Sequence, residues 1–101
     1  MAALINVDTI YRVTEVKSEE RVLGIALMED NPNETQNDVT FGGDTRCYRE
    51  MRFRNGTRKE VPMTIERFFK LIKKGDSVRI KGGRDWDGTI RAHEVRIQSF
   101  Y

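Results

Sequence analysis

The chain has 101 residues, with 18 basic and 16 acidic side chains, one histidine and one cysteine. This length predicts a single domain over residues 1–101 with a modest hydrophobic core. One cysteine excludes an internal disulfide framework, and neither a long apolar run nor a secretory leader pattern is present. We therefore expect a cytoplasmic protein that does not contact a membrane.

Charge is divided unevenly along the chain. Residues 1–45 hold three basic and nine acidic side chains, a net charge of −6, whereas residues 46–101 hold fifteen basic and seven acidic ones, a net charge of +8. A basic half is typical of proteins that bind a polyanion. It is also typical of an ordinary solvated surface, so the position of the cations along the predicted strands has to decide between the two interpretations.

Two strands are predicted in the first part of the chain. Residues 7–16 carry apolar side chains in both alternating sets, which indicates a strand partly buried on both faces, as in a small barrel. Residues 17–20 are polar and favour a turn. Residues 21–28 form the most apolar run and predict a central strand, in which Gly24 indicates a bulge or a sharp bend.

Residues 29–44 predict a long acidic loop. This segment is rich in Asp, Glu and Asn and contains Pro32 and the Gly42-Gly43 pair. A loop of this length within a compact domain is usually functional or mobile. The next strand could begin early, at residues 39–41.

Residues 45–54 predict the third strand. Strict alternation places Cys47, Met51 and Phe53 toward the core. The opposite face carries one aromatic side chain among basic ones, namely Arg46, Tyr48, Arg52 and Arg54. Asn55-Gly56 is a hairpin signal, so residues 57–61 are expected to fold back as a short extra strand that ends at Pro62.

A short helix is predicted after this strand. Thr64 is placed to cap its N-terminus, and Glu66 lies in its first turn. Helical spacing gives one apolar stripe, made of Ile65, Phe68, Phe69 and Ile72. Gly75 is expected as the residue that follows the helix end. A helix with one apolar face is suited to closing the bottom of a barrel.

Residues 75–97 predict a basic hairpin. Val78 and Ile80 alternate with cations in its first strand, which the Gly82-Gly83 pair is expected to break. Residues 84–88 form a polar connection that ends in Asp-Gly, with Trp86 at its tip. The second strand carries Ile90, Ala92, Val95 and Ile97, and its spacing slips by one between Ala92 and Val95, as a β-bulge would require.

The order of elements, three strands, a helix and two strands, resembles the OB-fold. The hairpin phrase "Gly-Asp-x-Val-x-Ile-x-Gly … Asp-Gly-x-Ile-x-Ala-x-x-Val" is similar to the strand 4 to strand 5 hairpin of OB domains of the replication protein A or bacterial single-strand-binding type. The resemblance implies an all-β fold, a five-stranded Greek-key barrel with one short helix between strands 3 and 4. Family members bind their ligand on the strand 2–3 face and on the loops after strands 1 and 4, which implies roles for Arg46, Tyr48, Arg52, Trp86, Lys17 and Arg21.

The residues themselves also favour binding to single-stranded DNA or RNA. A basic groove for phosphates and aromatic side chains for stacking are the two features that such proteins combine. We expect phosphates at Arg46, Arg52, Arg79, Lys81 and Arg84, with Arg54 and Arg91 adding positive charge, and bases on Tyr48 and Trp86. Such an activity belongs to processes like DNA replication. The alternative for Trp86 is a lid over the barrel mouth.

Other functions have weaker signals. Cys47 fits a small core residue better than a nucleophile, and His93 fits a surface position better than a base. Asp85 and Asp87 fit a turn, and one cysteine with one histidine is too few for a structural zinc site. We therefore expect no enzyme activity, cofactor or metal. The runner-up is an OB-fold interaction or assembly subunit that binds a partner protein or a second copy without contacting nucleic acid.

Overall fold

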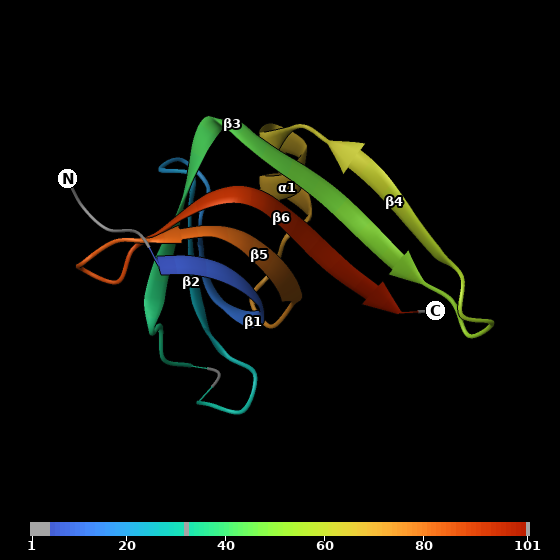
Figure 1. Cartoon of the computed structure of the whole chain (residues 1–101), viewed down its shortest axis with the longest axis horizontal. Coiled ribbons are helices and arrows are strands. Elements are labelled where there is room, and N and C mark those ends of the chain that lie inside the picture. Colours follow the sequence, from blue (N-terminus) through green and yellow to red (C-terminus); the bar gives the residue numbers. More distant parts are fainter. Residues whose placement is uncertain (1–4, 32, 101) are drawn as a thin grey trace.

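The computed structural model describes residues 5–31 and 33–100, which form one closed β-barrel with an arm (Figure 1). The described part contains six strands and one helix in the order β1 (Ile5–Lys17), β2 (Val22–Leu27), β3 (Asn37–Arg52), β4 (Arg58–Met63), α1 (Ile65–Leu71), β5 (Ser77–Arg84) and β6 (Ile90–Phe100). Residues 1–4, 32 and 101 lie outside the described residues. The helix of this part, α1, is too short to cross a membrane.

Five of the strands close the barrel. The sheet order β2-β1-β5-β6-β3 is completed by direct pairing of β2 with β3. The pairs are antiparallel except for β3 with β6, which run parallel. This connectivity confirms the predicted five-stranded OB-fold barrel. β4 is the extra strand that the Asn-Gly signal predicted; it pairs with β3 alone and forms the outer edge of the arm (Figure 1).

The helix closes one end of the barrel, as the apolar stripe predicts. Phe68 is fully buried, with its ring centroid 5.1 Å from that of Phe41 and 5.5 Å from that of Phe69. The hydroxyl of Thr64 accepts a hydrogen bond from the backbone N–H of Arg67 and so caps the helix. Seven residues are too few for an isolated helix in water, so this packing holds α1 in place.

Two elements near the helix, α1 itself and β4, end at other residues than predicted. α1 ends at Leu71, and Gly75, with φ of +95°, lies in the turn before β5, where its N–H donates to the Val13 carbonyl at 2.8 Å. β4 continues through Pro62 to Met63. A proline is tolerated here because the register with β3 turns its nitrogen toward the unpaired edge of the arm.

The acidic loop is shorter than predicted because β3 begins at Asn37. β3 first pairs with β2 and later with β4, and it bends between the two halves. Phe41 pairs with Ala92 but Arg46 with Glu94, so the residues from Gly42 to Thr45 form an irregular bulge within the strand. The expected loop therefore ends at residue 36.

Core predictions for the third strand hold in part. Cys47 is buried as predicted and Met51 is half-buried. Phe53 was expected in the core, but it lies just beyond β3 and is 39% exposed. In this region β3 has left the barrel and belongs to the arm, where it pairs with β4 on one side and with β6 on the other.

The β5–β6 hairpin shows one correct and one wrong prediction. The bulge is confirmed: Lys81 pairs with Glu94 and Gly82 with Ala92, so His93 is the extra residue. The Gly82-Gly83 pair does not break the strand, since β5 runs on to Arg84. A Cβ atom on Gly82 would lie 2.1 Å from the Arg91 carbonyl oxygen, so glycine permits a close approach of the two backbones.

Candidate functional site

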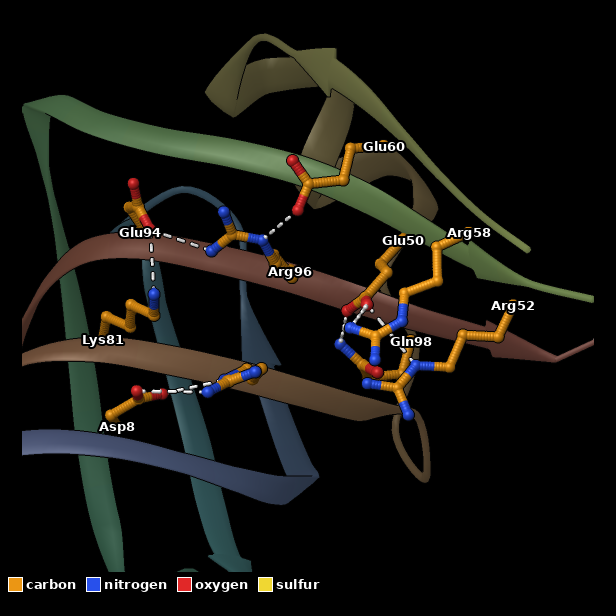
Figure 2. Close-up of polar contacts among 10 residues, drawn as sticks. Asp8, Glu50, Arg52, Arg58, Glu60, Lys81, Glu94, Arg96 and Gln98 are labelled. Carbon is orange, nitrogen blue, oxygen red and sulfur yellow. Dashed lines mark hydrogen bonds and ion pairs between the residues drawn. The ribbon is translucent and has the colours of Figure 1, made fainter. Parts of the chain in front are cut away.

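The side chains that point outward from β5, β6 and residues 46–52 of β3 form one continuous surface, here called the outer face. Register brings Arg79 beside Arg96 and Arg96 beside Tyr48, while Lys81, Glu94 and Arg46 form the neighbouring row. β1 borders this face on one side and β4 on the other (Figure 2). Register thus brings four of the predicted cations together on one surface, namely Arg46, Arg52, Arg79 and Lys81.

Carboxylates neutralise most of these cations. Asp8 accepts two hydrogen bonds from Arg79, at 2.8 and 3.1 Å, and these bonds hold the pKa of its carboxyl below the usual value. Glu94 accepts from Arg96 at 2.8 Å and lies 3.9 Å from Lys81. The hydrogen bond from Arg96 likewise lowers the pKa of Glu94. We call these alternating charges on β1, β5 and β6 the charge ladder, and Figure 2 marks its contacts as dashed lines.

Arg96 is the centre of this ladder, and the sequence analysis missed it. It bridges Glu94 and Glu60, each at 2.8 Å, and its guanidinium lies over the ring of Tyr48 at 4.8 Å from the centroid. Only 14% of its side chain is exposed. Tyr48 therefore already stacks on a cation on one side, and the bulge at His93 was the signal that could have placed Glu94 and Arg96 on this face.

A second cluster surrounds Glu50, which is buried at 4% exposure. Gln98 donates to it at 2.7 Å, and the guanidinium groups of Arg52 and Arg58 lie at 3.4 and 3.7 Å. Burial raises the pKa of the Glu50 carboxyl, but the hydrogen bond from Gln98 and the charge of Arg52 outweigh it, so that the pKa is lowered overall. Arg52 thus balances a buried carboxylate in addition to facing solvent.

Two of the five cations that were predicted to contact phosphates are different in this respect. In the described part of the chain, Arg46 and Arg84 form no ion pair. Arg46 lines a hollow of about 540 Å³ together with Lys81 and His93, and with the acidic Asp44 and Glu94. Both cations are available to an anion without breaking an existing contact.

Trp86 lies at the tip of a tightly bonded turn between β5 and β6. The N–H of Gly88 donates to the Asp85 carbonyl at 3.0 Å, and Asp87 accepts from the N–H of Thr89 at 2.9 Å. Gly88 adopts φ of +87°, a conformation that favours glycine. The indole is 83% exposed, so Trp86 is not a lid on the barrel.

A hollow of about 520 Å³ lies beside this indole. It is lined by Arg84 and Trp86 together with Ile5, Asn37, Asp85 and Gly88. Asn37 donates to the Gly88 carbonyl at 2.7 Å and so ties the turn to the start of β3. Arg91, which is 70% exposed, pairs with Asp85 at 2.9 Å and connects this hollow to the outer face.

The β2 part of the strand 2–3 face that the resemblance implied is covered by the chain itself, whereas Arg46, Tyr48 and Arg52 of β3 lie on the outer face. A Cβ atom on Gly24 would lie 2.7 Å from the hydroxyl of Thr35 in the β2–β3 loop, and Ala26 is 1% exposed. Arg21 pairs with Glu66 of the helix at 2.8 Å. Lys17, at the end of β1, and Arg54, beyond β3, also lie outside the outer face.

The sequence's candidate reactive groups are placed as follows. Cys47 is 3% exposed, and burial raises the pKa of its thiol to about 11, which keeps it protonated at neutral pH. His93 is exposed at the bulge. Within the described residues, no three His, Cys, Asp or Glu side chains come together as around a metal ion.

Comparison of the chain with protein-family models, with curated proteins and with solved structures found no match. The structure therefore gives the fold class, an OB-like barrel, and the arrangement of charges and aromatic side chains on it. Any function has to be inferred from that arrangement.

Proposed function

We propose that the protein binds single-stranded DNA or RNA with little sequence preference, along a track that runs from Trp86 across the outer face. The observation that carries this proposal is the exposed indole on a hydrogen-bonded turn, with Arg84, which forms no ion pair among the described residues, in the hollow beside it. A stacked base gains about 1–3 kcal/mol from such a side chain. Because hydrogen bonds already hold this turn in the free protein, little conformational entropy is lost when a base stacks on the indole.

Phosphates would follow β6 away from this tip. Arg91 comes first, then the row of Arg46 and Lys81, then Arg79 beside Arg96. From residue 90 to residue 96 a strand spans about 20 Å, at roughly 3.3 Å per residue. The track is therefore short, and it suits the lower end of the ~4–16 nucleotides that one OB unit covers.

The ion pairs on this track do not prevent binding. Exposed pairs contribute only about 0–1 kcal/mol each, because water screens both charges. A phosphate that replaces Asp8 on Arg79, or Asp85 on Arg91, thus exchanges one weak contact for another. Arg46 and Arg84 would make the first contacts, and we expect an affinity of the order of micromolar, about −8 kcal/mol.

The experiment is a titration with an unlabelled thymidine oligomer at low and then moderate salt, followed by the fluorescence of the single tryptophan. A labelled oligomer read by anisotropy runs in parallel. Saturable quenching that weakens as salt rises is expected. Comparison of deoxyribose and ribose oligomers of the same sequence then separates DNA from RNA.

Two variants make the test specific. Trp86→Ala should weaken binding by about 5- to 150-fold, the equivalent of 1–3 kcal/mol. Phe100→Ala is the matched control, because Phe100 is also an exposed aromatic residue, at 70%, but lies at the far end of β6. Anisotropy without quenching would remove Trp86 from the site, and no change in either signal at low salt would refute the proposed function.

A further inference from the structure

A second surface lies on the other side of the arm, between β4 and α1. A groove of about 390 Å³ runs there, with an apolar lining and two arginines, made chiefly of Met51, Val61, Met63, Leu71, Arg49 and Arg67. The residues lining it include no carboxylate. Val61 is 37% exposed at this groove although it is β-branched and apolar. The groove is thus suited to an occupant that presents apolar side chains next to negative charge.

The groove exists because β4 stands outside the barrel. Alternation along β4 turns Val61 and Met63 to the side of the helix, while Glu60 faces the opposite side and reaches Arg96 on the outer face. α1 packs into the barrel through Phe68 and leaves Leu71 half-buried at the groove. Neither element covers the space between them.

The same chain carries an exposed segment that combines apolar side chains with a negative charge, as an occupant of this groove would need to. Residues 27–30 form a β-turn, in which the N–H of Asp30 donates to the Leu27 carbonyl at 3.1 Å. Leu27 and Met28 are exposed at 38% and 37%, and the exposed Glu29 follows them. A hydrogen bond from the Leu27 N–H to Gln36 holds the turn at 3.0 Å. Met28 and Glu29 therefore stand at the tip of a preformed turn.

One molecule cannot bring these two surfaces together. Figure 1 shows the loop after β2 at the bottom of the view and β4 at the upper right, on separate sides of the barrel. The charges of the two surfaces are complementary, because the turn belongs to the acidic half of the chain and the groove to the basic half. Contact between them requires two molecules, arranged head to tail.

We infer that the 27–30 turn of one copy docks into the β4–α1 groove of a second copy. Met28 contacts Val61 and the neighbouring apolar side chains, and Glu29 lies near Arg67. The contact is heterologous, so every complex keeps one free turn at one end and one free groove at the other, and short chains grow as the concentration rises. Because the patch is small, association is weak, and because it includes opposite charges, salt weakens it.

Sedimentation velocity of the full chain, without nucleic acid, tests this inference from micromolar to millimolar concentration at low salt. The wild-type protein should form concentration-dependent species larger than a dimer. Met28→Asp and Val61→Asp should each raise the dissociation constant at least tenfold, because each places a carboxylate in an apolar contact. Ile10→Asp is the matched control, since Ile10 is exposed to the same 37% but lies on β1.

Mixing the two variants gives the decisive result. The Val61→Asp protein keeps an intact turn and the Met28→Asp protein keeps an intact groove, so the mixture should form dimers that do not grow further. Far-UV circular dichroism verifies that each variant is folded. A wild-type protein that stays monomeric at the highest concentration, an equal effect of Ile10→Asp, or a mixture without dimers would each overturn the inference. The nucleic-acid titration is independent of all three outcomes.

Discussion

The substitution Gly82→Ala tests the close approach of β5 and β6 at the bulge. A Cβ atom on Gly82 would lie 2.1 Å from the Arg91 carbonyl oxygen and 3.0 Å from its carbon. Both neighbours are backbone atoms, so no side chain can turn away to relieve the contact. The two strands would have to separate by about 1.3 Å to restore an ordinary van der Waals distance of 3.4 Å.

The expected cost follows from this overlap. Overpacking of a well-packed region costs about 1–3 kcal/mol, and more where backbone has to move. Alanine restricts the unfolded chain and returns about 0.4–1 kcal/mol. Because backbone has to move here, we expect the upper end of that range, about 3 kcal/mol, so the net loss of unfolding free energy is about 2–2.6 kcal/mol, a large part of the ~5–15 kcal/mol of a small domain. At about 4–8 °C per kcal/mol, the melting temperature should fall by roughly 10–20 °C.

The assay is urea denaturation followed by far-UV circular dichroism, because the exposed Trp86 is a poor reporter of folding. Gly43→Ala is the matched control: it lies in β3, and a Cβ there meets no atom within 4 Å. Gly43→Ala should be neutral or slightly stabilising. If Gly82→Ala unfolds at the same urea concentration as Gly43→Ala, the close approach at the bulge is wrong.

Three further predictions concern the core and the buried groups. Phe68→Ala should lower the unfolding free energy by about 3–5 kcal/mol in the same denaturation assay, because it empties a fully buried site. Glu50→Gln should destabilise the protein at pH 7 by leaving Arg52 and Arg58 without their carboxylate. Since the pKa of Glu50 is lower in the folded state, this difference should shrink as pH falls below the unfolded value of about 4.3, and a difference that stays the same from pH 7 down to pH 3 would contradict it. Cys47 should react with a thiol reagent only after unfolding, which rapid labelling of the native protein would contradict.

Elements with a strong local signal could be predicted from the sequence. The capped helix with its apolar stripe and the slipped spacing around His93 both depend on residues close together in the chain. Gly82 and Pro62 misled because each has two meanings: glycine marks a turn or a close approach, and proline ends a strand or occupies its free edge. The partner strand decides between the meanings, and that partner is distant in sequence.

Of the residues on the outer face, the sequence predicted the cations but not the carboxylates that pair with them. Arg79 meets Asp8, which is 71 positions away, and Arg96 meets Glu60, which is 36 positions away. No local pattern announces such pairs, so the sequence predicted a bare basic groove where the structure has a ladder of alternating charges. On the outer face, the excess of +8 in residues 46–101 is therefore partly offset by Asp8 from the acidic half, while Glu60 and Glu94, which are already counted in that excess, pair with Arg96.

This ladder leads to a prediction on the salt dependence of binding. If phosphates contact only Arg46 and Arg84, the two cations of the proposed track that form no ion pair within the described chain, the slope of log K against log salt should be about −1.4, at roughly −0.7 per contact. If phosphates also displace the carboxylates from Arg79, Lys81 and Arg91, five contacts would give about −3.5. Asp8→Asn distinguishes the two cases, because removing the competitor of Arg79 should tighten binding only if that arginine meets a phosphate. An unchanged affinity with a shallow slope would restrict the track to the hairpin tip and Arg46, whereas a steep slope with tighter binding would show that the carboxylates hold the cations in place until a nucleic acid replaces them.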